Sequence, residues 1–534
     1  MLLSELIGGT PAGGGVDVVR GDPSSVRICD LTEDSRTVMP GSLFVARRGH
    51  RADGRAFIAD AIGAGAAAVL TDRGASLEGV RAGAAVLVCD DVALAAAVLA
   101  ERFYGVPSRS LLVAAVTGTN GKTTVAHLVH RILNRCGVRC GLIGTVEIDD
   151  GTERAVSSVT TPGSIELSRT LSVMVEMGCR ASVLEASSHG LDQKRVDGLA
   201  LDAAVFTNLS GDHLDYHGTM EAYAAAKRRL FELADASRKG GGEGGVSIVN
   251  ADDPWGRSMA GAAPVWCTAG DGPSSTEPNW SVETVSATLD GTRLRVRGPG
   301  AVFEATIGLI GAHNAMNALQ AAACCDGLLR RSGVVDAGVR AGLLSSAMEG
   351  VGPPPGRLEP VHGGGDRVRV LVDYAHTDDA LARTLAAVRG LTPERARVWV
   401  VFGAGGERDK SKRPRMGAAA CAADRIVVTS DNPRTEPPET IIGEILAGID
   451  DAVRRDGRVS VHADRREAIE RAVRDARDGD AIVIAGKGHE TEQVLPDGFG
   501  GVVSRPFDDR AEARRALGLR GGAGEPPLEG AAAG

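Results

Sequence analysis

Short apolar runs that end abruptly in small or polar residues recur through the second and third parts of the chain. Residues 111–124 read LLVAAVTGTNGKTT, and the same pattern returns in VSIVNADD, VRVLVDYAH, RVWVVFGAGG and AIVIAGKGHE. Helical patterns such as DDALARTLAAVRG separate these runs. Near-continuous apolar strands alternating with helices are typical of parallel α/β sheets, whose ligands bind just beyond the carboxyl ends of the strands. We therefore expect the polar clusters that end these strands to form binding sites.

Two proline-bearing junctions divide the chain. YGVPSRS near residues 104–110 and MEGVGPPPGRLE near residues 348–359 are turn-rich breaks between patterned segments. They predict three domains, over residues 1–107, 108–350 and 351–519. Pattern alone leaves the class of the first domain open, because strand-like and Ala-rich helical stretches are mixed there. Residues 520–534 carry little apolar surface, and we expect them to be disordered.

Composition narrows the functional classes. With 534 residues and 43% hydrophobic positions, the chain is long and apolar enough to bury several cores. A net charge of −9 and an aromatic content of 3% argue against nucleic-acid binding. No basic leader and no long apolar run stand out, so we expect a cytoplasmic protein without a membrane partner. Nine cysteines without a CxxC spacing indicate buried thiols rather than zinc or disulfides.

Lysine is scarce, which makes each retained lysine informative. Of 60 basic residues only seven are lysine, so arginine supplies the charge wherever a cation merely keeps the protein in solution. A retained lysine therefore indicates a site that needs a compact ammonium or a primary amine. Lys227 is one such residue, within the helical pattern EAYAAAKRRLF. A solvated helix face is the usual interpretation of that pattern, and the scarcity favours a functional one.

The segment VTGTNGKTT, residues 116–124, joins an apolar strand to a helix. Exposed backbone N–H groups and a helix N-terminus bind phosphates, and Lys and Thr side chains add a charge and a Mg²⁺ ligand. The loop is shorter than GxxxxGK[ST], because Val116 stands where the first Gly would be. A glycine turn before a helix is the alternative, and we favour nucleotide binding. The candidate residues are Gly118, Thr119, Asn120, Gly121, Lys122, Thr123 and Thr124.

Three further positions carry candidate chemistry. Glu185 ends ASVLEASSHG and His213 follows FTNLSGD, so a carboxylate and an imidazole at neighbouring strand ends could hold Mg²⁺ beside phosphates. For either residue alone, a solvated strand end is the favoured interpretation. IVVTSDNPRTE, residues 426–436, contains the turn signal Asn-Pro, and Asp431 could cap a helix that begins near Pro438.

Together these motifs resemble the ATP-dependent Mur ligases of peptidoglycan synthesis. The resemblance spans residues 34–510 and rests on TGTNGKTT, TTPGS, EASSHGLDQKR, FTNLSGDHLDYHGTMEAYAAAK, GAHNAMNALQAA, PGRLE, DYAHT, FGAGGERDKSKRP, DNPRTE and GKGHE. It implies an N-terminal α/β UDP-binding domain, a central P-loop ATPase-like parallel-sheet domain and a C-terminal Rossmann-like domain that binds an amino acid. It also implies that a monomer joins meso-2,6-diaminopimelate to UDP-N-acetylmuramoyl-L-alanyl-D-glutamate through an acyl phosphate.

The resemblance assigns roles residue by residue. The UDP portion would contact Glu33, Ser35, His50, Arg51 and Ala52. The muramoyl-peptide portion would contact Thr160, Thr161, Ser187, Gln193 and Arg195. Lys122, His213 and Lys227 would be catalytic, and Mg²⁺ would be held by Thr123, Glu185, His213 and Lys227, the last carbamylated by CO₂. ATP would also contact Asn314, Asn317, Arg357 and Asp373. Diaminopimelate would contact Arg408, Asp431, Asn432, Pro433, Arg434, Gly486 and Glu490.

Four positions depart from the family pattern, and three other functions remain alternatives. Asp378, Glu407, Ser411 and Glu492 stand where Pro, Asp, Gly and Tyr are usual. A ligase that adds L-lysine would lack the Arg of DNPR, since L-lysine has no second carboxylate to pair. A folylpolyglutamate-synthase-like ligase would share the phosphate loop, but the DSR and GHRAD segments argue against it. A P-loop switch would hydrolyse ATP without any acceptor and would leave the third domain's clusters unexplained.

Overall fold

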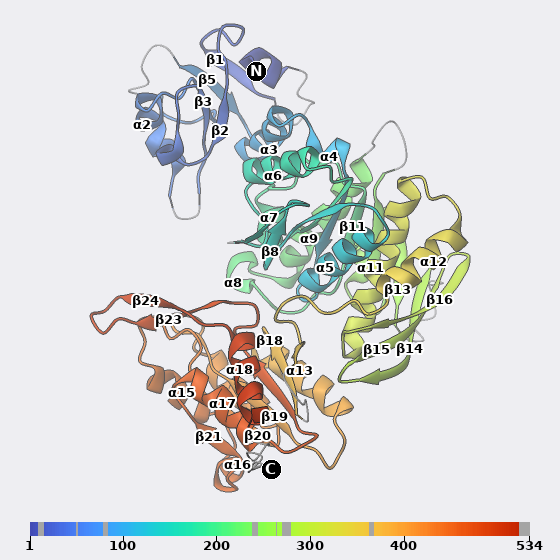
Figure 1. Cartoon of the computed structure of the whole chain (residues 1–534). Coiled ribbons are helices and arrows are strands. Elements are labelled where there is room, and N and C mark those ends of the chain that lie inside the picture. The colour runs from blue at the N-terminus through green and yellow to red at the C-terminus, as the bar shows by residue number, and fades with distance from the viewer. Residues whose placement is uncertain are drawn as a thin grey trace, which may run out of the picture. The chain divides into compact units, whose positions relative to one another are not determined.

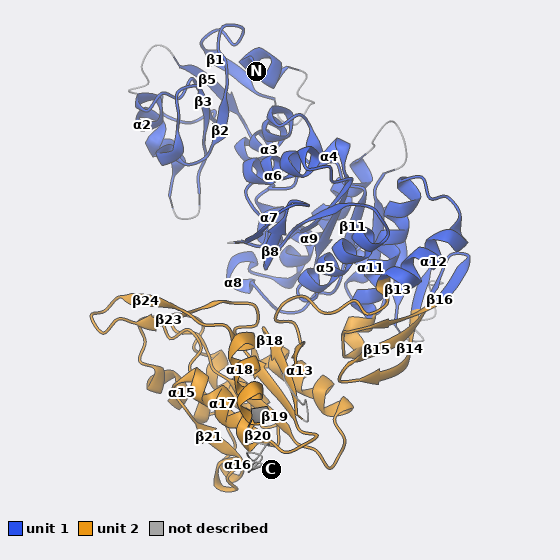
Figure 2. Cartoon of the chain, viewed as in Figure 1, with its two compact units in different colours: residues 1–281, 297–303, 316–347 blue, residues 282–296, 304–315, 348–534 orange. Residues whose placement is uncertain are grey.

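A computed structural model describes residues 1–8, 15–49, 52–77, 84–157, 159–237, 244–262, 264–269, 279–362 and 368–522. The chain divides into two compact units (Figure 2). Unit 1 comprises residues 1–281, 297–303 and 316–347, and unit 2 comprises residues 282–296, 304–315 and 348–534. Figure 1 labels the helices and strands in chain order.

Unit 1 begins with a five-stranded sheet in the order β1-β5-β4-β3-β2. Its strands are β1 (Asp17–Arg20), β2 (Asp30–Thr32), β3 (Ser42–Ala46), β4 (Ala68–Asp72) and β5 (Ala85–Cys89). Strands β2 to β5 run parallel, and β1 is antiparallel to β5. The helical segments are α1 (Leu3–Ile7), η1 (Ser35–Thr37), η2 (Gly54–Phe57), α2 (Ile58–Gly63) and α3 (Val92–Phe103). The first segment, whose class the sequence left open, is therefore α/β.

The central sheet of unit 1 is largely parallel. Strands β12 (Val246–Asn250), β11 (Ala203–Phe206), β6 (Leu112–Thr117), β10 (Ala181–Glu185) and β7 (Cys140–Ile143) are parallel neighbours in that order. Strand β13 (Pro264–Thr268) flanks β12, and antiparallel β8 (Glu147–Asp149) and β9 (Arg154–Val156) follow β7. Its helices include α4 (Pro107–Ser110), α5 (Lys122–Arg135), α6 (Ser164–Glu176), α7 (Ser188–Asp192), α8 (Leu214–His217), α9 (Met220–Ala236) and α10 (Gly256–Met259).

Several elements contribute residues to both units. These are β14 (Trp280–Thr288), β15 (Gly291–Gly298), β16 (Ala301–Ile307), α11 (Ala312–Arg331) and α12 (Ala337–Met348). Within unit 1, β14 begins beside β13, where Cys267 pairs with Trp280. Pattern reasoning did not anticipate the strands β14 to β16.

Unit 2 contains a six-stranded sheet in the order β17-β18-β22-β19-β20-β21. The strands are β17 (Glu359–Val361), β18 (Arg369–Asp373), β19 (Val398–Phe402), β20 (Arg425–Val428), β21 (Val459–Val461) and β22 (Ala481–Ala485). All pairs are parallel except β17 with β18. An antiparallel hairpin, β23 (Glu492–Pro496) and β24 (Val502–Pro506), follows β22.

Helices cover both faces of this sheet, which explains why its central strands β19 and β22 are apolar at every position. Val400 and Phe402 of β19 pack with α13 (Asp378–Leu391), α14 (Lys412–Ala420) and α15 (Pro438–Leu446). The alternate residues, Trp399 and Val401, pack with α17 (Arg465–Asp475) and α18 (Asp509–Gly522). Helix α16 (Asp451–Arg455) lies between α15 and β21 in the chain. Burial on both faces is the arrangement that continuous apolar strands predict, so the parallel α/β prediction is confirmed.

Some local predictions need correction. Helix α15 begins at Pro438 as expected, but its N-cap is Pro437 without a side-chain hydrogen bond, so Asp431 does not cap it. Helix α18 runs to Gly522, three residues into the segment expected to be disordered, and residues 523–534 lie outside the described chain. The nine cysteines are free thiols and most are buried, although Cys29 is exposed. Among the described residues, no helix is long and apolar enough to cross a membrane.

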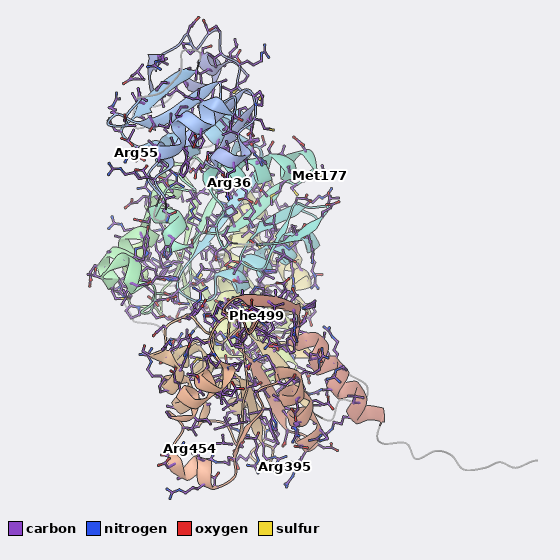
Figure 3. All side chains as sticks on the ribbon, turned by 90° about the vertical axis from the view of Figure 1, so that its left-hand side faces the viewer. Arg36, Arg55, Met177, Arg395, Arg454 and Phe499 are labelled. Atoms are coloured by element: carbon purple, nitrogen blue, oxygen red, sulfur yellow. The ribbon has the colours of Figure 1, made fainter. Side chains whose placement is uncertain are left out.

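Arginine supplies most of the exposed cations, as the lysine count suggested, although Lys410 is also exposed. Arg36, Arg395 and Arg454, labelled in Figure 3, are all exposed. The same figure labels Phe499, which connects β23 to β24 and is 96% exposed. Lys227 and Lys487, in contrast, are 1% and 0% exposed. The two buried lysines are therefore candidates for specific roles.

Candidate functional site

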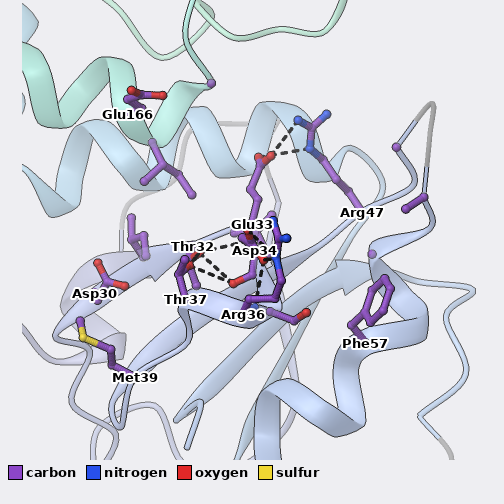
Figure 4. A pocket seen from close by; sticks show the side chains of 18 of the residues that line it. Asp30, Thr32, Glu33, Asp34, Arg36, Thr37, Met39, Arg47, Phe57 and Glu166 are labelled. Carbon is purple, nitrogen blue, oxygen red and sulfur yellow. Dashed lines mark hydrogen bonds and ion pairs between the residues drawn. The ribbon is translucent and has the colours of Figure 1, made fainter. Parts of the chain in front are cut away.

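A large cavity of about 1020 Å³ lies in unit 1 beside the first sheet (Figure 4). The predicted residues Glu33, Ser35 and Ala52 line it, whereas His50 and Arg51 lie outside the described residues. Arg47, which the sequence did not single out, donates to both carboxylate oxygens of Glu33 at 3.1 and 2.8 Å. Helix α6 adds Ile165, Glu166 and Arg169 to the lining. The cavity is large enough for a nucleotide-sized ligand.

The residues predicted for the peptide portion gather beyond β10. Thr161 Oγ1 donates to the carbonyl oxygen of Glu185 at 2.8 Å and lies 3.0 Å from Ser187 Oγ. Arg195 donates to the carbonyl oxygen of Thr161 at 2.5 Å and to Gln193 Oε1 at 2.7 Å. Burial lowers the pKa of Arg195, and the positive charge of Arg47 lowers it further. A desolvated guanidinium of this kind is suited to binding an anion.

Thr160 lies in the same region, where Thr145 connects it to Glu185 by hydrogen bonds. Thr145 Oγ1 donates to Thr160 Oγ1 at 3.0 Å and to Glu185 Oε2 at 3.1 Å. Thr160 is partly exposed, so its hydroxyl can also reach a ligand. The five residues predicted for the peptide portion are thus neighbours at one strand end.

The phosphate loop has the predicted strand, loop and helix geometry. Gly118 has φ +148°, and a Cβ there would overlap Thr207 Oγ1, so the tight turn requires glycine. Gly121, with φ +87°, caps α5, and a Cβ there would lie 2.7 Å from Asn317 Oδ1. Lys122 Nζ donates to the carbonyl oxygens of Gly118 and Thr119 at 3.0 and 2.9 Å. The loop therefore presents a helix N-terminus and an ammonium together, which suits phosphate binding.

Lys227 lies beneath this loop. Its Nζ donates to the carbonyl oxygen of Gly118 at 2.8 Å and lies 4.4 Å from the ring centroid of Tyr223. Burial lowers the pKa of Lys227 well below its ordinary value, and the charge of Lys122 lowers it further. Tyr223, one helical turn before Lys227, also shares a 3.2 Å hydrogen bond with Thr119 Oγ1. Lys227 is therefore a buried amine whose charged form is destabilised by its surroundings.

Glu185 and Thr123 form a pair of oxygen donors behind the loop. Glu185 is 0% exposed, and its Oε2 accepts from Thr123 Oγ1 at 2.9 Å. The backbone N–H of Thr145 donates to Glu185 Oε1 at 2.7 Å. Carboxylate and hydroxyl oxygens are ligands that Mg²⁺ accepts.

His213 has different surroundings from the other predicted metal ligands. It is the N-cap residue of α8 with φ +53°, and its ring packs against His189 with the centroids 4.8 Å apart. Within the described residues, no group of three or more His, Cys, Asp or Glu side chains is arranged to hold a metal. The structure thus brings Thr123 and Glu185 together, while a metal role for His213 stays a prediction.

The residues predicted for adenine and ribose are divided between the two units. Asn317 lies in unit 1 beside Gly121, whereas Asn314, Arg357 and Asp373 lie in unit 2. The Asp373 carboxylate accepts from the backbone N–H groups of Leu358 and Ala375 at 2.7 and 3.0 Å. The Arg357 guanidinium lies 4.7 Å from the ring centroid of Tyr374. These two hydrogen bonds fix the backbone on both sides of the Asp373 carboxylate, including the loop that follows β18.

In unit 2, the structure brings together all the residues predicted to bind the amino acid. We call this set the rim cluster: Arg408, Asp431, Asn432, Pro433, Arg434, Gly486 and Glu490. Arg434 Nη1 donates to the carbonyl oxygen of Gly406 at 2.7 Å. A Cβ at Gly405 would lie 3.2 Å from Arg434 Nη1 and 3.7 Å from Arg408 Cγ, so both arginines flank one glycine.

The acidic half of the rim cluster is equally close-packed. Gly486 has φ +118°, and a Cβ there would overlap Asp431 Oδ2. Glu490 Oε2 accepts from Asn432 Nδ2 at 2.8 Å. Two arginines and two acidic residues of the rim cluster therefore lie at the carboxyl ends of the neighbouring parallel strands β22, β19 and β20, where ligands of α/β sheets bind.

The four departures from the family pattern lie beside these residues. Glu407 has φ +53°, and its backbone N–H donates to Glu436 Oε1 at 2.6 Å. Ser411 Oγ donates to Asp409 Oδ1 at 2.7 Å. Asp378 begins α13 and pairs with Arg415 at 3.2 Å, and the carbonyl oxygen of Glu492 accepts from Lys487 Nζ at 2.6 Å. Each departure is accommodated by a local contact.

Sequence reasoning missed several residues of this site. Tyr223 could have been found from its i, i+4 spacing to Lys227 on one helix face. Lys487 could have been found from the scarcity of lysine. Arg47 and Thr145 carry no comparable signal, because their partners Glu33 and Glu185 are 14 and 40 residues away in sequence.

Comparison with known proteins places this geometry in a family. Residues 28–104 match the model of the Mur ligase family, catalytic domain; residues 116–325 match the Mur ligase middle domain; and residues 356–488 match the Mur ligase, glutamate ligase domain. A relative from Gloeobacter violaceus, named UDP-N-acetylmuramoyl-L-alanyl-D-glutamate–2,6-diaminopimelate ligase, is 41% identical, covering 93% of this chain and 95% of the relative. A relative of the same name from Chlorobaculum tepidum is 43% identical, covering 92% of each chain.

Solved structures agree with these sequence matches. A structure bearing the same ligase name has a TM-score of 0.66 and 32% identity, covering 93% of this chain and 96% of that one. The MurF ligase of Thermotoga maritima in complex with ADP has a TM-score of 0.56 at 19% identity, covering 86% and 94%, and shares the fold. Because the sequence matches span nearly the whole chain, the chain belongs to the Mur ligase family.

Proposed function

We propose that this chain is an ATP-dependent amide ligase that adds meso-2,6-diaminopimelate to the D-glutamate of UDP-N-acetylmuramoyl-L-alanyl-D-glutamate, in peptidoglycan precursor synthesis. The observation that carries the proposal is the rim cluster, where Arg408 and Arg434 flank Gly405, Asp431 lies against Gly486, and Glu490 accepts from Asn432. Diaminopimelate has an amino-acid head at each end, and only one amine reacts. Its other head needs receptors for a carboxylate and an ammonium, which these side chains supply.

In this proposal, each of the three predicted domains binds a different substrate. Residues 1–107 bind UDP in the cavity that Glu33, Ser35 and Ala52 line. Residues 108–350 bind ATP on the phosphate loop and the muramoyl peptide near Thr161, Ser187 and Arg195. Residues 351–519 bind diaminopimelate at the rim cluster. These boundaries and contacts are our assignments, and the cytoplasmic location and monomeric state remain predictions from the sequence.

The chemistry follows from the charges involved. The D-glutamyl side-chain carboxylate attacks the γ-phosphorus of ATP, and ADP leaves. The diaminopimelate amine then attacks the acyl-phosphate carbonyl, loses a proton and displaces phosphate from a tetrahedral intermediate. Because the first attack brings anions together, the Lys122 ammonium and the amides at the start of α5 act to offset repulsion. Lys122 must leave its loop carbonyls to reach a bound phosphate.

The donor chemistry behind the loop fits Mg²⁺. Thr123 and Glu185 present a hydroxyl and a carboxylate 2.9 Å apart, and both are hard oxygen ligands. We assign Mg²⁺ to these two residues with His213 and a carbamate on Lys227. When bound, Mg²⁺ would withdraw negative charge from the phosphates.

The surroundings of Lys227 support carbamylation. CO₂ reacts with a neutral amine, and burial beside Lys122 favours that form of Lys227. The product carries a carboxylate and keeps one N–H, which can still donate to the Gly118 carbonyl oxygen. Arginine, which stays protonated, could not replace lysine in this reaction.

The alternative functions differ in which ligand groups the rim cluster would bind. A ligase that adds L-lysine has no second carboxylate to place against Arg434. A P-loop switch would need no acceptor receptor at all. Phosphate release from ATP and UDP-N-acetylmuramoyl-L-alanyl-D-glutamate tests the proposal against the switch. We expect release to depend on diaminopimelate, and release at the same rate without any acceptor would reject the ligase function.

A further inference from the structure

Lys487 is a fully buried cation at the centre of the rim cluster. Its side chain is 0% exposed, and it lies between Gly486 and Gly488, which have φ +118° and +55°. These left-handed conformations turn the chain so that the intervening side chain points inward. A buried ammonium needs three acceptors. Lys487 Nζ has three within reach: Asn432 Oδ1 at 3.1 Å, Glu490 Oε2 at 3.0 Å and the carbonyl oxygen of Glu492 at 2.6 Å.

These contacts fix the orientation of the Asn432 amide. Two donors converge on Asn432 Oδ1, Lys487 Nζ at 3.1 Å and the backbone N–H of Val494 at 3.0 Å. The amide oxygen must therefore face them, and the amide nitrogen must face Glu490. Asn432 Nδ2 accordingly donates to Glu490 Oε2 at 2.8 Å.

The same contacts fix the Glu490 carboxylate. Lys487 and Asn432 both bind Oε2, so one oxygen of Glu490 is held by two donors while Oε1 is directed elsewhere. The Glu490 side chain is 34% exposed, so a ligand can reach the group. Because two donors hold Oε2, the Glu490 carboxylate cannot rotate freely, and the direction of Oε1 is fixed as well.

Lys487 also lowers the net negative charge of the acidic half of the cluster. Its ammonium lies 3.0 Å from the Glu490 carboxylate and so offsets part of the charge of Asp431 and Glu490. A less negative site leaves less repulsion for the carboxylate beside the ligand ammonium. A more negative site would favour a ligand whose far end is a bare ammonium.

We propose that Lys487 is the positioning residue that selects an acceptor bearing both a carboxylate and an ammonium at its far end. It acts by holding Asn432 and Glu490 in place and by lowering the negative charge that the ligand meets. This inference rests on the proposed function, since it names how that same site distinguishes diaminopimelate from L-lysine.

The test compares kcat/KM for meso-diaminopimelate and L-lysine in the wild-type enzyme and in Lys487→Met. We expect kcat/KM for diaminopimelate to fall about tenfold or more, while that for L-lysine stays the same or rises. The ratio of the two constants therefore falls, and the KM values for ATP and the UDP substrate stay within about twofold. A purely structural role would lower both constants together and leave their ratio unchanged, which would overturn the inference.

A second variant and a control keep the test decisive. Lys487→Gln keeps a hydrogen-bond donor and loses the charge, so it should lower the same ratio with a smaller loss of thermal stability. Arg340→Met in unit 1 is the control, because Arg340 is 6% exposed and donates to Asp326 at 2.6 Å. We expect it to lower Tm without changing the acceptor ratio, and an equal change of ratio in both variants would overturn the inference. A wild-type enzyme inactive with diaminopimelate would instead reject the proposed function.

Discussion

Lys122 and Lys227 donate hydrogen bonds to one acceptor, the carbonyl oxygen of Gly118, at 3.0 and 2.8 Å. Two ammonium groups on one carbonyl repel each other, and the more buried one is the more easily deprotonated. Lys227 is the more buried, and burial together with Lys122 lowers its pKa. The predicted phosphate loop thus also holds a lysine whose charged form is disfavoured by burial and by a second ammonium.

Lys227→Ala should abolish most ligase activity, by about 100-fold or more, because the anion that orients Mg²⁺ is lost. Short carboxylates such as acetate should restore part of the activity by occupying the vacated space. Phosphate release measures both effects. Arg228→Ala is the matched control, since its side chain is 59% exposed on the same helix, and it should remain active. Full activity in Lys227→Arg would contradict the carbamate role.

The lowered pKa of Lys227 also predicts how stability depends on pH. The ordinary value is 10.5, so below that pH the unfolded chain binds a proton that the folded chain binds less readily. The folded state therefore carries a free-energy cost that is largest below the folded-state pKa, shrinks as pH rises above it and disappears above about 10.5. In CO₂-free buffer, Lys227→Met should raise Tm at neutral pH, and the gain should shrink as pH rises towards 10.5. A gain independent of pH would show that the lysine titrates normally.

Local sequence signals were enough to predict the phosphate loop and the strand ends. The strand, glycine loop and helix of residues 111–135 are contiguous, so their geometry follows from neighbouring residues. The same holds for Glu185 at the end of β10 and for the turn at Asn432 and Pro433. These features were predicted because the forces that create them act within a few residues.

Contacts between distant segments could not be predicted in this way. Lys487 meets Asn432 across 55 positions, and only the parallel sheet brings their loops together. The proposed helix cap by Asp431 was wrong because an N-cap must immediately precede the helix, and α15 begins seven residues later. Asp431 instead lies against Gly486 in the rim cluster. Periodicity identified the strands, but only the fold shows which loops face each other.

Gly486→Ala should weaken diaminopimelate binding, because the added Cβ would overlap Asp431 Oδ2. The KM for diaminopimelate should rise about tenfold or more, with the KM values for ATP and the UDP substrate nearly unchanged. Gly498→Ala is the matched control, since Gly498 also has a positive φ, +81°, but a Cβ there meets nothing within 4 Å. Equal effects of the two substitutions would show that backbone strain alone is responsible.

Arg434→Ala should remove one receptor for the distal carboxylate. A charge-assisted hydrogen bond of this kind contributes about 1.5–3 kcal/mol, so diaminopimelate binding should weaken by about 10- to 100-fold. Isothermal titration with each substrate separately would measure the effect. If all three substrates bound equally more weakly, the DNPR turn would be scaffold rather than receptor.

The most direct test of the central claim is the ratio of kcat/KM for meso-diaminopimelate to that for L-lysine, with ATP and UDP-N-acetylmuramoyl-L-alanyl-D-glutamate held constant. The claim is that the rim cluster selects an acceptor with an amino-acid head at both ends. We predict a ratio of about 100 or more, as expected when a site's buried charges are left unpaired by the wrong ligand. A ratio of one or below, with L-lysine turned over at least as well, would contradict the claim.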